Sequence, residues 1–502
     1  MSNVSLDIEV GARLWADQPA IVHAPSGVVA SYGDLANRIE LVTGALRSFG
    51  IEPGDRVAIV EGNTLNHVAA WYGILRTGAL AVDFNFLLSG YEWGHVYADC
   101  TPRLAIAGAP FAPMIAASGD QPVWTMERLL EQPSPPELRA AEFQSLDDHA
   151  VIAYTSGTTG LPRGVVHSHR SVSRQLNLLR QVCGYDEQWT SYVAVPLFAL
   201  QGFLPQVAAT LRFGGTVVLD DKFDPQRFAE MSRRYPISYT TLSSPMLPRL
   251  LALGEQNTID LSHIRLLSCG GAPLHQEDRV AFENRFDVHV TQGYSSTEVL
   301  GAFVMELYGD APHGAAGKVF SDRSDPIRIM HDDAGNAAPV GEVGEIAFHR
   351  SCALRKYWSQ SDGDESTFVG GEWYATGDVG RIDEDGYVFV LDRKKDVVIR
   401  GGFNIFSAEI ERVLTSHPAV QEAVVVGAPS EQLGEIPIAF VVCEPDSDVS
   451  NEELQAHALQ QLGRLKTPES ITQVQFDDLP RNSIGKVQKA ELRDRVRVQA
   501  MR

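Results

Sequence analysis

Apolar positions in the middle of the chain alternate between two periods. Short apolar runs with the length of buried strands occur at residues 151–154, 192–195, 216–219, 237–241 and 264–268. Between the first two runs, apolar side chains follow helical spacing, at Val172, Leu176, Leu179 and Cys183. Strand-length runs that alternate with helical segments are typical of a layered sheet, so we predict an α/β fold.

The pattern changes in the last third of the chain. From Gly344 onward, short strand-like segments are joined by tight turns, and Asp385-Gly386 predicts a hairpin. Beyond residue 394, helical patterns and apolar runs form a smaller group: helices at 407–416, 451–462 and 489–498, and strands at 423–426 and 438–442. We therefore expect two domains, residues 1–394 and 395–502. A proline-rich stretch at 132–138 closes the first subdomain.

Composition narrows the class of protein. A chain of 502 residues is long enough for about three compact units. Its formal charge of -22 disfavours nucleic acid and anionic lipid as partners, so a phosphorylated ligand needs a local cluster of donors. Five cysteines without a CxxC pair predict neither a zinc site nor a disulfide framework. The sequence shows no signal segment and no membrane span, and we expect a cytoplasmic location.

Residues 154–167 gather hydroxyl side chains and glycines between an apolar strand and a predicted helix. Glycines allow the backbone to approach phosphate closely, at Gly157, Gly160 and Gly164. Hydroxyls can bind phosphate oxygens or Mg²⁺, at Thr155, Ser156, Thr158 and Thr159. The spacing differs from GxxxxGK[ST], which excludes a Walker-type ATPase. We predict a phosphate-binding loop of a nucleotide-using enzyme.

Six segments, in this order, resemble those of the acyl-adenylate-forming enzymes. They are TSGTTGLPRGV at 155–165, GGAPL at 270–274, QGYSSTE at 292–298, YATGD at 374–378, DRKKD at 392–396 and PRNSIGK at 480–486. The resemblance covers nearly the whole chain. It implies a large N-terminal domain of two layered α/β subdomains with a small β-barrel-like subdomain, and a small mobile α+β C-terminal domain. It also implies acyl-CoA ligase activity with ATP or acyl-AMP, Mg²⁺ and CoA.

The resemblance implies roles for individual residues in binding the nucleotide. Tyr294 would face adenine, Thr297 would bind the α-phosphate, and Glu298 would bind Mg²⁺ together with Thr158. Asp378 would accept hydrogen bonds from the ribose hydroxyls, beside Arg393. The other implied nucleotide-binding positions are Gly271, Ala272, Pro273, Gln292, Gly293, Ser295 and Ser296.

The C-terminal part carries further implied roles. Lys486 would bridge the attacking carboxylate and the α-phosphate, and so would be catalytic along with Glu298, Thr158 and Arg163. Lys395 matches the hinge about which the small domain rotates. The segment formed by Gly401, Gly402 and Phe403 would then pass beside the pantetheine arm of CoA.

Two positions depart from the family pattern. Arg163 occupies a place that usually holds lysine, and a planar guanidinium is not equivalent to a compact ammonium. Ala199 replaces a histidine or aromatic residue that walls the substrate carboxylate. Loss of that wall would affect mainly the adenylation half-reaction, because alignment contributes much of the rate of a displacement step.

Three functions follow from this pattern. The first is a complete ligase that converts a hydrophobic carboxylic acid to its acyl-CoA thioester through acyl-AMP. The second is a non-adenylating variant that only transfers a preformed acyl adenylate, supplied by a partner ligase, to CoA. The third is a catalytically idle protein that binds acyl or nucleotide ligands. We favour the first, because Glu298, Asp378 and Lys486 are retained.

The sequence gives a partial indication of the substrate. The residues predicted to line the acyl pocket are small or apolar; they are Ala199, Phe203, Ser268, Gly270 and Tyr294. Such a lining suits a sizeable hydrophobic acid of specialised metabolism, and Ala199 cannot hold the ammonium of an amino acid. A homodimer is compatible with the sequence.

Overall fold

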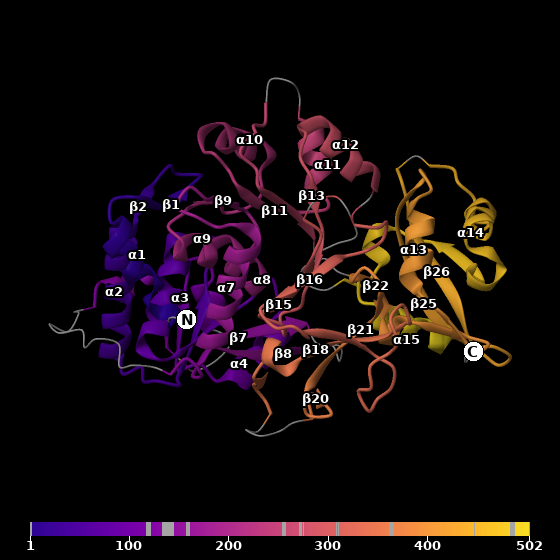
Figure 1. Ribbon diagram of the computed structural model, residues 1–502, viewed down its shortest axis with the longest axis horizontal. Helices are drawn as coiled ribbons and strands as arrows, with labels where there is room; N and C mark the ends of the chain where they lie inside the picture. The colour runs from indigo at the N-terminus through magenta and orange to yellow at the C-terminus, as the bar shows by residue number, and fades with distance from the viewer. Residues whose placement is uncertain are drawn as a thin grey trace. The chain divides into compact units, whose positions relative to one another are not determined.

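The chain forms two compact units (Figure 1). Unit 1 contains Met1–Pro326 and Phe348–Tyr374, and unit 2 contains Ile327–Ala347 and Ala375–Arg502. The computed structural model describes residues 3–116, 122–132, 145–156, 161–253, 258–270, 274, 276–307, 309, 311–360, 366–445, 447–481 and 487–500. Residues 133–138 of the predicted proline-rich linker lie outside these ranges.

The first sheet of unit 1 has the strand order β13-β12-β11-β9-β10-β1-β2. All its neighbouring strands are parallel except β1 and β2. The strands are β1 (Pro19–His23), β2 (Val29–Ser31), β9 (Thr190–Val193), β10 (Thr216–Leu219), β11 (Tyr239–Ser243), β12 (Leu266–Gly270) and β13 (Val290–Thr291). Parallel strands bring their carboxyl ends to one edge, where α/β sheets bind ligands.

The second sheet of unit 1 has the order β19-β8-β7-β4-β3-β5-β6. The strands are β3 (Arg56–Val60), β4 (Leu80–Asp83), β5 (Leu104–Ala107), β6 (Val123–Trp124), β7 (His149–Ser156), β8 (Pro162–Ser168) and β19 (Lys356–Tyr357). Strand β8 runs antiparallel to both β7 and β19. This antiparallel edge carries the predicted phosphate loop.

Alternate residues of each strand enter different cores. Val57 and Ile59 of β3 pack with Ile21 of β1 in a core between the two sheets, whereas Ala58 and Val60 pack in a core on the other face. Because side chains alternate along a strand, a sheet covered on both faces needs such a continuous apolar run. Unit 1 is therefore layered, with helices on both faces of each sheet.

The helices of unit 1 fill these layers. The central layer includes α2 (Tyr32–Phe49), α3 (Leu65–Thr77), α7 (His169–Cys183), α8 (Leu200–Phe203), a π-helical turn (Leu204–Ala208) and α9 (Ala209–Arg212), with α1 (Asp7–Trp15) and α6 (Met126–Leu130) beside α2. The second sheet's outer face is covered by α4 (Gly90–Cys100) and α5 (Ala112–Ala116). The first sheet's outer face is covered by α10 (Pro225–Arg234), α11 (Met246–Leu251) and α12 (Gln276–Phe286).

Unit 1 also contains short antiparallel strands. These are β14 (Gly293–Tyr294), β15 (Ala302–Met305) and β16 (Gly317–Ser321), which pair in that order, and β20 (Phe368–Val369), which pairs with the start of β21 (Trp373–Ile382). The connection between β14 and β15 contains residues 295–301 and therefore Glu298. Within the described ranges, no helix is long and apolar enough to cross a bilayer.

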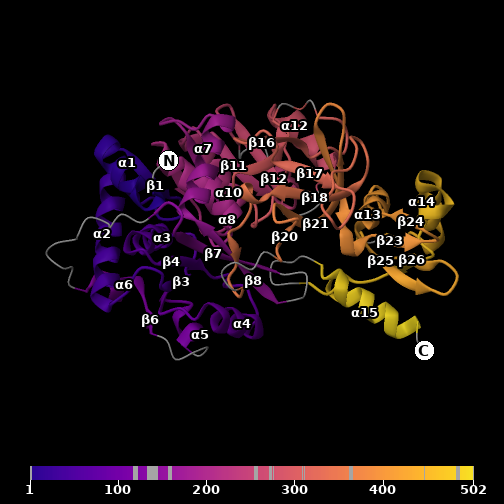
Figure 2. The same cartoon turned by 60° about the horizontal axis from the view of Figure 1, so that its bottom comes forward.

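Unit 2 has a small sheet covered by helices on both faces. The sheet has the order β24-β23-β26-β25, with β27 beside β26; its strands are β23 (Val398–Arg400), β24 (Phe403–Ile405), β25 (Val420–Ser430), β26 (Gly434–Cys443) and β27 (Ser470–Gln473). Figure 2 shows α13 (Ser407–Thr415) and α14 (Asn451–Lys466) on one side of β25 and β26, and α15 (Lys489–Ala500) on the other. The unit also includes β17 (Ile327–Met330), β22 (Tyr387–Arg393), and most of β18 (Gly344–His349) and of β21.

The structure confirms the α/β class, the layered sheets and the small C-terminal α+β part. The expected hairpin at Asp385-Gly386 joins β21 to β22. The helix expected after residue 167 is α7, which begins at His169. Residues 162–168 form the strand β8, which the sequence pattern did not predict, since Val165 and Val166 bury their branched side chains. The predicted domain boundary at residue 395 coincides with the hinge about which the small domain would rotate. This boundary stays a prediction.

Candidate active site

The predicted phosphate loop joins two antiparallel strands, β7 and β8. Thr155 lies directly opposite Arg163, and Tyr154 lies opposite Gly164. The hairpin therefore places the hydroxyl-rich and cationic positions side by side at the end of the second sheet. Ser156 ends β7 at the same place.

Arg163 packs against Tyr357, which belongs to the neighbouring edge strand β19. Tyr357 lies opposite Val165, two residues from Arg163, so the two long side chains are diagonal neighbours on one face. The Arg163 Cζ atom lies 4.2 Å from the centre of the Tyr357 ring, and Nη2 donates a hydrogen bond of 3.3 Å to the phenolic oxygen. The ring thus supports the guanidinium by a cation–π contact.

The Tyr357 hydroxyl continues this chain of contacts. It donates to Glu298 Oε1 over 3.3 Å and lies 3.2 Å from the hydroxyl of Tyr374. Because the single phenolic proton points to Glu298, Tyr374 is the donor in the second contact. Burial, reinforced by the negative charge of Glu298, raises the pKa of both tyrosines, which keeps them protonated at neutral pH.

Two side chains from β8 and α7 fix the ends of the segment that carries Glu298. The buried His167 donates from Nε2 to the carbonyl oxygen of Thr297 over 2.7 Å. Burial lowers the pKa of His167 to about 4, so the imidazole is neutral at physiological pH. At the other end, the backbone N–H of Gly301 donates to Gln175 Oε1 over 2.8 Å.

Sequence reasoning missed these supporting residues. Tyr357, His167 and Gln175 received no role, and Tyr374 was noted only as part of a motif. The one available signal for His167 is a polar residue that follows Val165-Val166 inside an apolar strand. A buried polar side chain needs a partner, and the partner is distant in sequence.

The carboxyl edge of the first sheet carries part of the predicted acyl pocket. Gly270 ends β12 and Ser268 lies two residues earlier, with its hydroxyl 2.8 Å from the hydroxyl of Thr241. Tyr294 follows β13 closely, and its ring lies 6.3 Å from the ring of Phe348. Gln292, Gly293, Ser295 and Ser296 flank Tyr294 in the same connection.

The remaining two pocket positions lie at opposite ends of the short helix α8. Ala199 precedes the helix and is exposed, whereas Phe203 is 0% exposed and packs on Trp71 with ring centres 4.8 Å apart. Buried Asn63 accepts a hydrogen bond from the N–H of Leu197 and donates to the backbone of neighbouring Val195, both over 2.9 Å. Asn63 therefore holds the segment that leads to Ala199.

In unit 2, the structure brings Asp378 and Arg393 together. They lie opposite each other on β21 and β22, and Arg393 Nε is 2.8 Å from Asp378 Oδ1. The turn before Asp378 has Gly377 at a φ of +76°, and its N–H donates to Glu345 Oε1 over 3.0 Å. Asp378 is buried while Arg393 stays partly exposed, so this carboxylate is held at a fixed position.

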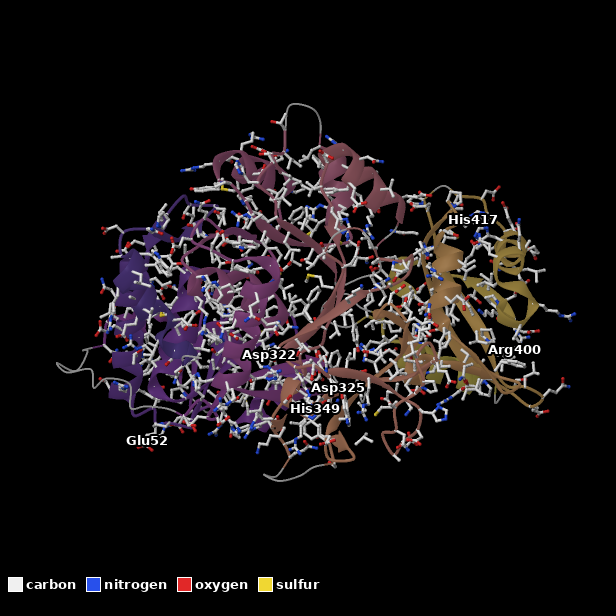
Figure 3. The ribbon with its side chains drawn as sticks, viewed as in Figure 1. Glu52, Asp322, Asp325, His349, Arg400 and His417 are labelled. Atoms are coloured by element: carbon white, nitrogen blue, oxygen red, sulfur yellow. The ribbon has the colours of Figure 1, made fainter. Side chains whose placement is uncertain are left out.

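The predicted hinge and CoA segment are also in unit 2. Lys395 is exposed, and its carbonyl accepts from Arg493 Nη1 over 2.9 Å. Gly401 and Gly402 both have positive φ, and Phe403 is 60% exposed. Arg400, labelled in Figure 3, anchors this turn through the carbonyl of Leu465 and the carboxylate of Glu469.

Several predicted site residues lie outside the described residues. They are Gly157, Thr158, Thr159, Gly160, Gly271, Ala272, Pro273 and Lys486. Their predicted roles stay predictions.

The described side chains of unit 1 include the kinds of group that bind a nucleotide and its magnesium ion. Glu298 offers a partly buried carboxylate, a suitable oxygen ligand for Mg²⁺. Arg163 offers a cationic fork, and its buried Nε has no hydrogen-bond partner among the residues that the structure describes. Thr155 adds a hydroxyl at the same end of the hairpin.

Comparison with known families agrees with this geometry. Residues 8–358 match the AMP-binding enzyme family, and residues 409–486 match the AMP-binding enzyme C-terminal domain. The two matches cover all predicted site residues except those in residues 374–403. This stretch lies between the two matched ranges and contains the predicted hinge.

Individual relatives cover nearly the whole chain. A long-chain-fatty-acid–CoA ligase of Mycobacterium tuberculosis is 29% identical, with 98% of each chain covered. A feruloyl-CoA synthase of Amycolatopsis is 32% identical over 96% of this chain and 97% of its own. The structure of o-succinylbenzoate CoA synthetase from Bacillus subtilis with its acyl-adenylate intermediate superposes with a TM-score of 0.86, at 26% identity and 98% coverage of both chains. The chain therefore belongs to the AMP-binding enzymes of the adenylate-forming superfamily.

Proposed function

We propose that this acid–thiol ligase carries out both half-reactions of acyl-CoA synthesis. In the first, a carboxylic acid and ATP give an acyl adenylate and pyrophosphate. In the second, the thiol of CoA displaces AMP. One observation carries the proposal: the cation at the phosphate loop is retained as Arg163, and Tyr357 links it to Glu298.

In the first half-reaction, a carboxylate oxygen attacks the α-phosphorus and the bond to the bridging oxygen of pyrophosphate breaks. Arg163 would bind the departing phosphates, and Lys486 would offset charge between the attacking carboxylate and the α-phosphate. Glu298 and Thr158 would hold Mg²⁺, which supplies positive charge to the phosphate oxygens when bound. The His167 contact holds the backbone of Thr297, whose hydroxyl would bind the α-phosphate.

In the second half-reaction, the sulfur of CoA attacks the acyl carbon and the bond to the AMP oxygen breaks. Asp378 with Arg393 would retain the ribose during this exchange, since the paired carboxylate keeps acceptor oxygens for two hydroxyls. The backbone at residues 401–403 would pass beside the pantetheine arm, where glycines leave room for close approach.

We further propose a hydrophobic acid as the substrate. Exposed Ala199, the small side chain of Ser268 and the bare backbone of Gly270, where an added Cβ would meet nothing within 4 Å, would leave room beside the sheet edge. The named substrates of the relatives, a long-chain fatty acid and a feruloyl group, support an acid with a large apolar part.

A two-part assay tests the proposal. Hydrophobic acids are supplied with ATP while pyrophosphate is measured, and synthetic acyl adenylates are supplied with CoA while thioester is measured. The proposal expects product in both assays. Thioester from adenylates without pyrophosphate from any acid would favour the non-adenylating variant, and no product in either would favour a binding protein.

A further inference from the structure

Tyr357 occupies a central place between the two charged groups of the predicted nucleotide site. Its ring supports the Arg163 guanidinium at 4.2 Å, while its hydroxyl accepts from Arg163 and donates to Glu298, each over 3.3 Å. The contacts join three elements: β8, β19 and the connection after β14. Tyr357 thus contacts both charged groups at once, through its ring and its hydroxyl.

The environment of Tyr357 favours a fixed geometry. The residue is 6% exposed, its backbone is paired with β8, and the Tyr374 hydroxyl lies 3.2 Å from its own. Both Arg163 and Glu298 can adopt many rotamers when free, and a partner common to both removes that freedom before a ligand arrives. An aromatic ring alone would hold only the guanidinium, because the contact with Glu298 needs the hydroxyl.

We propose that Tyr357 is a positioning residue that couples the phosphate-binding Arg163 to the metal-binding Glu298, through its ring on one side and its hydroxyl on the other. This inference rests on the proposed function, which assigns those roles to Arg163 and Glu298. It explains how an arginine can replace the usual lysine: the longer, planar cation is held on an aromatic ring. It also predicts that the two functions of Tyr357 can be separated by substitution.

Two variants separate the ring from the hydroxyl. Tyr357→Phe keeps the support for Arg163 but removes the hydrogen bond to Glu298, whereas Tyr357→Leu removes both. Tyr185→Phe is the matched control, because it also removes a buried tyrosine hydroxyl, which donates to the carbonyl of Pro205 over 2.7 Å away from the site.

Equilibrium binding of ATP is measured by calorimetry on the full chain, once with excess Mg²⁺ and once with a chelator. We expect Tyr357→Phe to weaken binding of magnesium-ATP about tenfold and to leave metal-free ATP within about twofold of the wild type. Tyr357→Leu should weaken both, and Tyr185→Phe neither. Thermal unfolding of all variants is recorded in parallel.

The outcomes distinguish this inference from the proposed function. If the wild type binds ATP and Tyr357→Phe binds magnesium-ATP equally well, the coupling role is wrong while the proposed function stands. If both affinities and the melting temperature of Tyr357→Phe fall together, Tyr357 has only a structural role. If the wild type binds no ATP under either condition, the proposed function fails, and the inference fails with it.

Discussion

The Nε2 atom of His167 lies 2.7 Å from the carbonyl oxygen of Thr297, in a contact between two segments 130 residues apart. His167 is fully buried and neutral, and because a carbonyl oxygen can only accept, Nε2 is the nitrogen that carries the proton. Its Nδ1 has no hydrogen-bond partner among the described residues. The contact fixes the backbone immediately before Glu298 by a single hydrogen bond from strand β8.

Replacement of His167 should therefore change nucleotide binding as well as stability. In His167→Leu the Thr297 carbonyl loses its donor, and a buried unsatisfied carbonyl costs about 1–3 kcal/mol. We expect a lower melting temperature and a KM for ATP raised about tenfold in the pyrophosphate assay.

The matched variant is His167→Gln, whose amide nitrogen can donate from nearly the position of Nε2. It should recover most of the KM for ATP while leaving some loss of stability from imperfect packing. Equal KM values for the Leu and Gln variants would show that the hydrogen bond does not position Thr297.

The same histidine makes the stability of unit 1 depend on pH. Burial lowers the pKa of His167 and of His169 to about 4 from an ordinary value of 6.5, although nearby Asp148 partly opposes the shift at His169. The unfolded chain therefore binds these protons at a higher pH than the folded chain. The stability that the two neutral histidines contribute is fully present above about pH 6.5 and is lost as the pH falls toward 4.

The variant His167→Gln removes one of these two titrating groups, so its comparison with the wild type gives the effect of His167 alone. Between pH 6.5 and 4, the free energy of unfolding of the wild type should fall relative to the variant by about 1.4 kcal/mol per pH unit. Urea unfolding of both proteins at several pH values measures this difference. A constant difference across the range would mean that His167 is protonated equally in both states.

Gly164 next to Arg163 should be intolerant of a side chain. A Cβ atom there would lie 2.9 Å from Ile152 Cγ2 and 3.1 Å from both Trp358 Cβ and Tyr154 Cζ. We expect Gly164→Ala to destabilise unit 1 by about 1–3 kcal/mol, because packed strands cannot move apart without losing other contacts. Chemical denaturation measures the change.

Gly94 within helix α4 is the control for this substitution. A Cβ atom at Gly94 would meet nothing within 4 Å, and alanine favours a helix over glycine by about 0.5–1 kcal/mol. Gly94→Ala should thus be neutral or stabilising. A Gly164→Ala variant as stable as the wild type would contradict the close packing of β7, β8 and Trp358.

The sequence predicts local features of this molecule well and distant contacts poorly. The apolar run at residues 151–154 and the Asp385-Gly386 turn depend on neighbouring residues, and both were predicted correctly. Tyr357 contacts Arg163 across 194 residues and Glu298 across 59, through a strand pairing that no local pattern specifies. The family motifs supplied Glu298, but its supporting residues Tyr357, His167 and Gln175 follow only from how β8, β19 and α7 pack around it.

The last prediction concerns Arg163 itself. If Arg163 replaces the usual lysine as a working phosphate clamp, Arg163→Lys should lower the rate of pyrophosphate formation about tenfold, because an ammonium cannot keep both the ring contact and the hydrogen bond with Tyr357. Thioester formation from a synthetic adenylate should be unchanged, since no pyrophosphate leaves in that step. Arg170→Lys is the control: Arg170 is an exposed arginine paired with Asp147, and both half-reactions should keep their rates. A faster adenylation in Arg163→Lys, or in that variant combined with Ala199→His, would instead show that these two positions limit the first half-reaction, as the non-adenylating account requires.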